Sequence, residues 1–188
     1  MTAHCVILAA GTASRMGGGK LLLPFGEGTV LDAVLAACAA YPTTLVASAE
    51  LAERYRGTRG GLSIVVNGEP QRGMAHSLRL AHRAISAEYP LAILLGDKPL
   101  VSAALVGRTI GALQPEVDVV YPARNGVPGH PVVLSARARG IVDELRDGDT
   151  LHLLRDVPRL RRRTLPSDDD GAFVDIDTEV DYRLILTL

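Results

Sequence analysis

The sequence has no excess of either charge: its 20 Lys and Arg residues nearly balance its 21 Asp and Glu residues, and the formal net charge is -1. Such a balance provides neither a basic footprint for nucleic acid nor a polyanionic tail. Long hydrophobic runs are also absent. The first apolar stretch, CVILAA, ends at Gly11, far below the length of a membrane span, and no basic flank of a signal peptide precedes it. We therefore expect a cytoplasmic protein that binds neither nucleic acid nor membrane.

Cysteine is scarce, and internal repeats and low-complexity segments are missing. Cys5 and Cys38 lie within apolar runs, which favours reduced core residues over a disulfide. Hydrophobic residues make up 47% and charged residues 22%, close to the averages of globular proteins, so disorder is not expected. A chain of 188 residues is the right size for a single domain over residues 1–188.

Apolar runs of strand length alternate with longer amphipathic segments along the first two thirds of the chain. The runs predict buried parallel strands at 4–9, 44–48, 62–66, 91–95 and 117–121. The segments between them predict helices at 29–41, 74–88 and 103–114. Thr29 and Ser102 are the expected N-caps of the first and last of these helices. This alternation predicts an α/β fold, a three-layer α/β/α sandwich with a mostly parallel, Rossmann-like sheet.

The rhythm changes after residue 122. Proline and glycine interrupt 122–131, then VVLS predicts a strand and 136–146 a helix. A last strand is expected at 172–176, followed by a helix from about residue 178 that Thr178 would cap. The end of the chain therefore reads as a small α+β decoration of the α/β core.

A glycine-rich loop, LAAGTASRMGGGK, directly follows the first predicted strand. It is not a P-loop, because Ser14 and Leu21 stand where that motif needs Gly and Ser or Thr. It does not open a helix as a dinucleotide fingerprint does, because Pro24 soon follows. Its small residues leave backbone N–H groups free for phosphate oxygens, and Arg15 and Lys20 can offset the phosphate charge. The loop predicts a triphosphate site; a flexible surface loop with two solvated cations is the alternative.

Acidic residues stand at two further expected strand ends. Asp97 follows the strand at 91–95, where a carboxylate can hold Mg²⁺, although Gly-Asp-x-Pro is also a good turn sequence. If 173–177 is extended, Asp175 and Asp177 share one face. We expect Asp177 to serve the following helix terminus and Asp175 to be the second metal ligand. Asp168–Asp170 predicts a solvated acidic turn.

The middle of the chain adds a loop and a helix start in NGEPQRGMAHSLRLA. Gly73 would allow close backbone approach, and Ser77 could hydrogen-bond a base or be an ordinary exposed helix residue. The basic run at 159–163 favours a solvated or edge strand over recognition of an anionic acceptor.

The glycine-rich loop resembles the A-A-G-x-x-x-R-M-G-x-x-K signature of nucleotidyltransferases with a Rossmann-like core, and every fixed position matches. The order LAAG…RMG…K, N…GM-x-x-S-L, LGD-x-P, G-x-x-G-H-P-V and D-I-D-T resembles the molybdenum cofactor cytidylyltransferases from Ile7 to Asp181. That resemblance implies transfer of CMP from CTP to the terminal phosphate of molybdopterin, with Mg²⁺ as the cofactor.

The resemblance also implies a role for each matching residue. The nucleotide-binding residues would be Leu8, Ala9, Ala10, Gly11, Arg15, Lys20, Gly73, Ser77 and Gly96. The catalytic residues would be Arg15, Lys20 and Asp97, and the metal ligands Asp97 and Asp175. The acceptor side would be lined by Lys98, Gly129 and His130, with a structural turn histidine as the alternative for His130.

Three details bear on the substrates. Ala10 favours cytosine, since the guanylyltransferase branch usually has L-A-G-G at this loop. Lys98 replaces the usual Gln or Met, and D-T-E-V-D lacks the usual proline after Thr178. The alternatives are a molybdopterin guanylyltransferase, a sugar- or polyol-phosphate cytidylyltransferase, and a non-catalytic nucleotide- or cofactor-binding protein. Transient contact with a molybdoenzyme or its chaperone would accompany the molybdenum cofactor reading.

Overall fold

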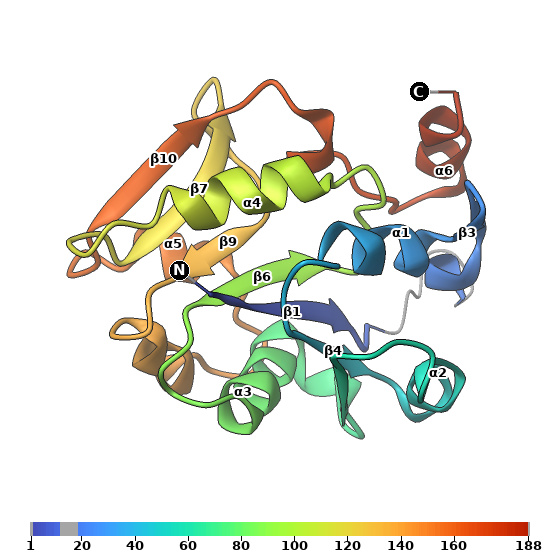
Figure 1. The fold of residues 1–188 in the computed structure, drawn as a ribbon, viewed down its shortest axis with the longest axis horizontal. Coiled ribbons are helices and arrows are strands. Elements are labelled where there is room, and N and C mark those ends of the chain that lie inside the picture. Colours follow the sequence, from blue (N-terminus) through green and yellow to red (C-terminus); the bar gives the residue numbers. More distant parts are fainter. Residues whose placement is uncertain (1, 12–18, 188) are drawn as a thin grey trace.

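The computed structural model describes residues 2–11 and 19–187. Its centre is a sheet with helices on both faces (Figure 1). The strands of this sheet are β1 (His4–Ala9), β4 (Thr43–Ala47), β5 (Leu62–Val66), β6 (Leu91–Leu95), β7 (Val119–Arg124), β8 (Val127–Pro128), β9 (Val132–Leu134) and β10 (Arg162–Pro166). A small hairpin, β2 (Pro24–Phe25) with β3 (Gly28–Thr29), lies outside it.

The sheet is mostly parallel. Its strand order is β10-β7-β9-β6-β1-β4-β5, and β8 pairs with β7. Strand β9 runs antiparallel to both of its neighbours, and β8 runs antiparallel to β7. The remaining neighbours pair in parallel. From β1 the chain continues to β4 on one side, and β6 lies on the other, so the order reverses at β1. Open α/β sheets bind ligands at such a point, beyond the carboxyl ends of the strands.

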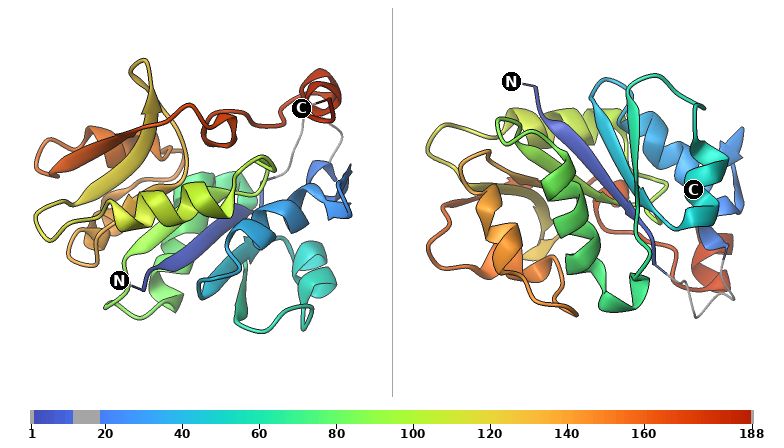
Figure 2. Two further views of the ribbon diagram at one scale, coloured as in Figure 1. Left: turned by 45° about the horizontal axis from the view of Figure 1, so that its top comes forward. Right: turned by 90° about the horizontal axis from the view of Figure 1, so that it is seen from below.

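Two hydrophobic cores, one on each face of the sheet, produce the three layers. Helices α1 (Val30–Ala37), α2 (Ala49–Tyr55) and α4 (Ala103–Gly111) pack into one core. Helices α3 (Met74–Ala84) and α5 (His152–Asp156), with the 3₁₀ helix η4 (Arg139–Glu144), pack into the other. Along β1 the side chains alternate between the cores, with Ile7 in the first and Val6 and Leu8 in the second. The view from below in Figure 2 shows the green helix α3 beside an orange helical segment on one face, and α3 and η4 are in contact. The predicted sandwich is confirmed.

Helix ends and buried thiols also follow the sequence. Thr29 and Asp32 form a capping box for α1, and the Ser102 hydroxyl accepts from the N–H of Leu105 at the start of α4. Thr178 and Asp181 form a second capping box at α6 (Glu179–Ile185). Cys5 and Cys38 are free and fully buried. Contact with Cys38 and burial both raise the pKa of the Cys5 thiol, so this thiol stays neutral.

The C-terminal third departs from prediction in two places. The expected helix at 136–146 is the short 3₁₀ helix η4, whose Ile141 N–H bonds to Ala138 three residues back; Gly140 within it disfavours a longer α-helix. The expected strand at 172–176 was wrong. The N–H groups of Phe173 and Val174 instead bond back to Asp170, so this segment pairs with no strand. Helices α2 and α5 were not predicted.

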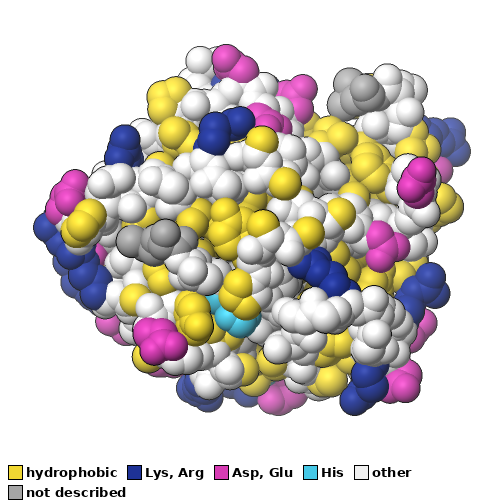
Figure 3. Space-filling view, viewed as in Figure 1, with side chains coloured by type: hydrophobic (Ala, Val, Ile, Leu, Met, Phe, Trp, Pro, Cys, Tyr) yellow, Lys and Arg dark blue, Asp and Glu magenta, His cyan; other side chains and the backbone are white. Residues whose placement is uncertain are grey.

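The basic run at 159–163 leads into β10, the edge strand of the sheet, as expected. Figure 3 shows acidic and basic side chains interspersed on one face of the molecule, in keeping with the balanced charge. No helix within the described ranges combines the length and apolar character that a membrane crossing requires.

Candidate active site

A cavity of about 310 Å³ opens at the carboxyl ends of β1 and β6. Its walls come from the end of β1, the 3₁₀ helices η2 (Lys20–Leu22) and η3 (Pro70–Arg72), the start of α3 and the end of β6. Most of the predicted nucleotide-binding residues line it, namely Leu8, Ala9, Ala10, Gly11, Lys20, Gly73 and Ser77, and so does Asp97. Arg15 lies outside the described residues. The sequence prediction thus brings together residues up to 89 positions apart at the point where the strand order reverses.

Gly96 supports this cavity without lining it. Its N–H bonds to the carbonyl of Leu8 at 3.0 Å, which ties the ends of β6 and β1 together. A Cβ at Gly96 would lie 3.2 Å from the Cβ of Ala9 and 3.3 Å from the Leu8 oxygen. The glycine is therefore needed for close strand packing beneath the cavity.

Lys20 connects the glycine-rich loop to the acidic residues. Its ammonium group lies 2.6 Å from Asp97 Oδ2, 2.7 Å from the Ile176 carbonyl oxygen and 3.4 Å from Asp177 Oδ1. Burial alone would lower the pKa of Lys20, but the hydrogen bond and charge of Asp97, with help from Asp177, raise it above its ordinary value. Lys20 is therefore firmly positive at neutral pH.

The segment 175–177 crosses the end of β6. The N–H of Ile176 donates to the Asp97 carbonyl at 3.0 Å, so Asp175 and Asp177 flank a residue that is fastened to Asp97. Asp175 Oδ2 lies 3.5 Å from the ammonium of Lys98. Asp177, expected to serve the helix terminus, points its carboxylate at Lys20 instead, because Thr178 and Asp181 already cap the helix.

Asp97 is suited to a divalent cation. Its Oδ2 is held by Lys20, while its Oδ1 is buried and has no hydrogen-bond partner among the described residues. A buried carboxylate oxygen without a donor is costly, and a hard cation such as Mg²⁺ would satisfy it. In residues 2–11 and 19–187, no three His, Cys, Asp or Glu side chains are already grouped as a metal site. The buried Oδ1 of Asp97 therefore suits a metal that takes its remaining ligands from water and substrate, whereas the Asp175 carboxylate is paired with Lys98.

At the start of α3 the cavity wall is formed by Gly73 and Ser77, and Asn67 supports Ser77. The Asn67 Oδ1 accepts from the N–H of Glu69 at 2.8 Å, and its Nδ2 donates to Ser77 Oγ at 2.9 Å. Ser77 is buried, which excludes the exposed alternative. Since Ser77 Oγ accepts from Asn67, its own proton can be donated into the cavity.

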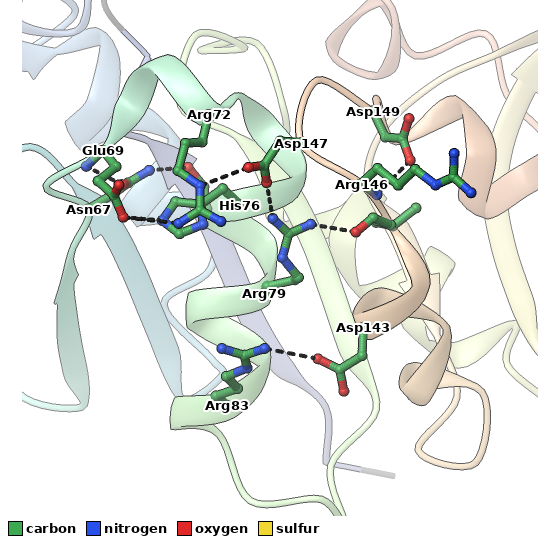
Figure 4. Close-up of polar contacts among 12 residues, drawn as sticks. Asn67, Glu69, Arg72, His76, Arg79, Arg83, Asp143, Arg146, Asp147 and Asp149 are labelled. Carbon is green, nitrogen blue, oxygen red and sulfur yellow. Dashed lines mark hydrogen bonds and ion pairs between the residues drawn. The ribbon is translucent and has the colours of Figure 1, made fainter.

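A polar network outside the cavity fixes this loop (Figure 4). Asp147 bonds to Arg72 at 2.8 Å through one oxygen and to Arg79 through the other. The Gly148 N–H bonds to the Arg72 carbonyl at 3.1 Å. Gly73 has φ +86°, and a Cβ there would lie 3.2 Å from Gly148 N. The turn at Asp147 and Gly148 thus packs against the loop that carries Gly73 and holds it in place.

A second cavity, of about 270 Å³, adjoins the first and shares Met74 and Leu95 with it. The predicted acceptor residues Lys98 and His130 line it, together with Asp175 and Phe173. Lys98 is only 5% exposed and also donates to the Phe173 carbonyl at 3.2 Å. The charged side chains beside this cavity are therefore the buried cations of Lys98 and Arg155 and the half-exposed carboxylate of Asp175.

His130 and Gly129 shape the same cavity differently. Burial, followed by the charges of Lys98 and Arg155, lowers the pKa of His130 to about 3, so its ring is neutral at physiological pH. Its Nδ1 is buried without a hydrogen-bond partner in the described part of the chain. Gly129 does not line the cavity. It lets the backbone approach Ala172, whose oxygen would lie 2.7 Å from a Cβ at this position.

The acidic turn at Asp168–Asp170 lies away from both cavities. Asp169 accepts from the Gly171 N–H and from the Ser102 hydroxyl, and Asp170 pairs with Arg124 at 2.8 Å. These contacts give the turn a structural role. Sequence reasoning missed Asn67 as the partner of Ser77, and it missed Arg155, which lies in a stretch without a motif.

Comparison with known proteins agrees with this geometry. Residues 5–165 match the family model described as a MobA-like NTP transferase domain, so the protein is a nucleotidyltransferase built on a Rossmann-like sheet. The chain belongs to the MobA-like NTP transferase family.

Three similar proteins illustrate the relationship. The molybdenum cofactor cytidylyltransferase of Escherichia coli (strain K12) is 31% identical over 136 residues, covering 70% of this chain and 69% of the relative. The nicotine blue oxidoreductase of Paenarthrobacter nicotinovorans is 31% identical over 195 residues, covering 96% and 95%. The crystal structure of Rv0371C in complex with manganese, from Mycobacterium tuberculosis H37Rv, has a TM-score of 0.80 and 27% identity, covering 100% and 99%.

Proposed function

We propose that this protein transfers CMP from CTP to the terminal phosphate of molybdopterin and releases pyrophosphate, with Mg²⁺ held by Asp97 and Asp175. The observation that carries the proposal is Asp97, which lines the first cavity, the nucleotide cavity, and whose buried Oδ1 has no partner among the described residues. The next residue in the chain, Lys98, lines the adjoining cavity. A metal-dependent transfer between two substrates needs such a junction. The relative from Escherichia coli, by its name, supports both the nucleotide and the acceptor.

The reaction is an in-line attack by an acceptor phosphate oxygen on the α-phosphorus of CTP, with pyrophosphate as the leaving group. The acceptor phosphate is already anionic, so no strong general base is needed. Lys20 offsets negative charge at the triphosphate and orients Asp97, and Arg15 adds a second cation by the family resemblance. Mg²⁺, when bound, neutralises charge on the α-phosphate and the departing pyrophosphate. Lys98 orients the acceptor, and delivery of the product to a molybdoenzyme would require transient contact with it or its chaperone.

Ser77 is proposed to read the base as a hydrogen-bond donor. Cytosine presents two acceptors, O2 and N3, toward such a hydroxyl. Asn67 keeps the hydroxyl proton available because the Glu69 N–H fixes the orientation of its amide. Specificity for cytosine over guanine then comes from Ser77 together with Ala10, which lines the same cavity.

Asn67→Asp is expected to raise the KM for CTP about tenfold, with a smaller effect on kcat. A carboxylate at this position accepts hydrogen bonds from both the Glu69 N–H and the Ser77 hydroxyl. The hydroxyl proton is then no longer available for a hydrogen bond to the base. A net hydrogen bond is worth roughly 1 kcal/mol or somewhat more, close to a tenfold change. The matched control is Gln71→Glu, the same amide-to-acid change at an exposed residue of the same loop. Equal KM values for CTP in both variants would rule out the hydroxyl as the base reader.

A second candidate function is an oxidoreductase, because the relative named nicotine blue oxidoreductase matches nearly the whole chain. The arrangement of Asp97, Lys20 and Asp175 around β6 favours the transferase, since hydride transfer has no need for metal-binding carboxylates. Nucleotide dependence separates the two functions. The oxidoreductase would bind a redox dinucleotide and release no pyrophosphate from any triphosphate.

The direct test measures pyrophosphate release with CTP, GTP, ATP and UTP, each with Mg²⁺ or Mn²⁺, in the presence of molybdopterin or a sugar or polyol phosphate. We expect release with CTP and molybdopterin. Release with GTP instead would identify a guanylyltransferase, and release with CTP and a sugar or polyol phosphate another cytidylyltransferase. A rise in Tm with nucleotide but no release would identify a binding protein.

A further inference from the structure

The second cavity, lined by Lys98 and His130, is the acceptor cavity of the proposed reaction, and it continues past His130. A third cavity, of about 540 Å³, shares Pro128, His152 and Arg155 with it. The walls of this outer cavity include Tyr121, Asn125 and Thr164. Among the described residues, these three cavities therefore lie in series. The nucleotide cavity meets the acceptor cavity at Met74 and Leu95, and the acceptor cavity meets the outer cavity at Arg155.

Arg155, from α5, lies at this last junction, and few groups compensate its positive charge. It is only 4% exposed, and its guanidinium lies over the Tyr121 ring, 5.7 Å from the ring centroid. Its one side-chain hydrogen bond among the described residues joins Nη2 to His152 Nδ1. No carboxylate of residues 2–11 and 19–187 lies within ion-pair distance of it. Buried arginines are ordinarily paired, because an uncompensated buried charge is costly.

Arg139 shows what a structural buried arginine looks like in the same protein. It is 3% exposed and has no carboxylate partner in the part of the chain that the structure describes. Its guanidinium nevertheless donates to the carbonyls of His82, Ile85, Ser86 and Tyr89. A fifth hydrogen bond joins Nε to His82 Nδ1. The N–H groups of Arg139 thus donate to carbonyl groups at the end of α3 and just after it. The N–H groups of Arg155 donate to no such carbonyl groups, although Arg155 is buried to nearly the same extent.

The groups around Arg155 favour an anion. Lys98 lines the acceptor cavity with it, and the single carboxylate there, Asp175, is already shared with Lys98 at 3.5 Å. His130 lines the same cavity, and because its ring is neutral it adds no charge there. Two buried cations and one carboxylate line the acceptor cavity, which gives this cavity a positive balance; the next carboxylate, Asp156, is exposed and lines the outer cavity. A guanidinium whose face is covered by Tyr121 offers its edge, which suits an oxyanion in its plane.

We propose that Arg155 binds an oxyanion of the acceptor substrate, a phosphate or a carboxylate, at the junction of the acceptor cavity and the outer cavity. This inference rests on the proposed function for the identity of the reaction, since it names the acceptor side of the same site. The acceptor is then a molecule long enough to extend past Arg155 toward Asn125 and Thr164. Lys98, next to Asp97 in the chain, faces its reacting end.

The kinetic test compares Arg155→Met with Arg159→Met, an exposed arginine that pairs with Glu144. With CTP and molybdopterin, Arg155→Met is expected to raise the KM for the acceptor at least tenfold and to leave the KM for CTP within twofold. Arg155→Lys keeps the positive charge but lacks the two parallel N–H donors of the guanidinium. Its KM for the acceptor should therefore lie between those of wild type and Arg155→Met. Equal effects on both KM values would overturn the proposal.

Stability separates binding from a structural role. In the absence of ligands, Arg155→Met should leave Tm unchanged or raise it, because it removes an unpaired buried charge. Arg139→Met should lower Tm, because it leaves several carbonyls without donors. A fall in Tm for Arg155→Met as large as that for Arg139→Met would show that Arg155 serves the fold, and the proposal would fail.

Calorimetric titration tests the site without turnover. Wild type, Arg155→Met and Arg159→Met are titrated with inorganic phosphate and with acetate at constant ionic strength, and only heat that depends on Arg155 counts. Phosphate-dependent heat identifies a phosphate site, and acetate-dependent heat a carboxylate site. Identical titrations of wild type and Arg155→Met with both anions would overturn the inference. Arg155-dependent binding in a protein that releases no pyrophosphate would support the anion site and reject the proposed reaction.

Discussion

Asp97→Asn is expected to lower pyrophosphate release by about three orders of magnitude. Metal-based charge stabilisation is worth several kcal/mol, and each 1.4 kcal/mol or so of barrier changes the rate tenfold. An amide cannot replace the carboxylate charge toward the cation that the buried Oδ1 is suited to bind. The measurement is single-turnover pyrophosphate release with saturating CTP, Mg²⁺ and acceptor.

The fold should tolerate this change. Asparagine has nearly the volume of aspartate, and Lys20 keeps its bonds to the Ile176 carbonyl and to Asp177. Loss of the ion pair with Lys20 should reduce the free energy of unfolding by about 1 kcal/mol, the usual size of such a contact when partly exposed. Because the pKa of Lys20 is raised in the folded state, this stabilisation is fully present at neutral pH and is lost only as the pH rises above the ordinary lysine pKa.

Two further variants identify the second metal ligand. Asp175→Asn is expected to reduce turnover strongly and Asp177→Asn only weakly, since Asp175 lines the acceptor cavity, whereas Asp177 lines neither cavity and faces Lys20. Asp168→Asn, at an exposed turn, is the control and should have no effect. Turnover of Asp97→Asn at the wild-type level would remove the metal assignment. The opposite ranking of Asp175 and Asp177 would move the second ligand to Asp177.

The part of the site that could be predicted from sequence follows from local patterns. The apolar runs that became β1 and β6 end at Gly11 and Asp97, and parallel strands bring their carboxyl ends to one edge. The capping residues Thr29, Ser102 and Thr178 were predictable because a cap needs only its own helix start. The arrival of Asp97 and Ser77 at one cavity therefore needed only the alternation of strands and helices.

The rest depends on contacts between distant segments. The segment 172–176 has the apolar alternation of a strand, but its N–H groups bond to Asp170 and Asp97 instead of to a neighbouring strand. No local pattern indicates that the Asp177 carboxylate will face Lys20, 157 positions away. Arg155 belongs to a five-residue helix without a signature, and its meaning arises only from Tyr121 and the two cavities beside it.

Gly171→Ala is expected to destabilise the protein by about 3 kcal/mol and to lower Tm by roughly 10 °C, the upper range for an overpacked position in a domain of this size. A Cβ on Gly171 would lie 2.2 Å from the Leu100 oxygen and 2.8 Å from the Cα of Val101. These are backbone atoms, so no rotamer change can relieve the clash. One of the two segments must move.

The movement would reach the active site, because Gly171 lies between the turn at Asp169 and the segment that carries Asp175. Leu100 and Val101 lie two and three residues after Lys98, and the Val101 N–H bonds to the Lys98 carbonyl. Separation of the two segments would therefore displace Asp175 relative to Asp97, and pyrophosphate release should fall more than the loss of folded protein explains. Calorimetric unfolding together with turnover per folded molecule measures both effects.

The matched control is Gly140→Ala in η4, where a Cβ would meet no atom within 4 Å. Because alanine lowers the conformational entropy of the unfolded chain relative to glycine, this variant should be as stable as wild type or slightly more stable. Equal Tm values for Gly171→Ala and Gly140→Ala would mean that Leu100 and Gly171 are not in close contact in solution. The placement of Asp175 beside Lys98 would then lose its support, because that contact holds the acidic segment against the end of β6. A large loss of stability with normal turnover per folded molecule would leave the packing intact and remove Asp175 from the reaction.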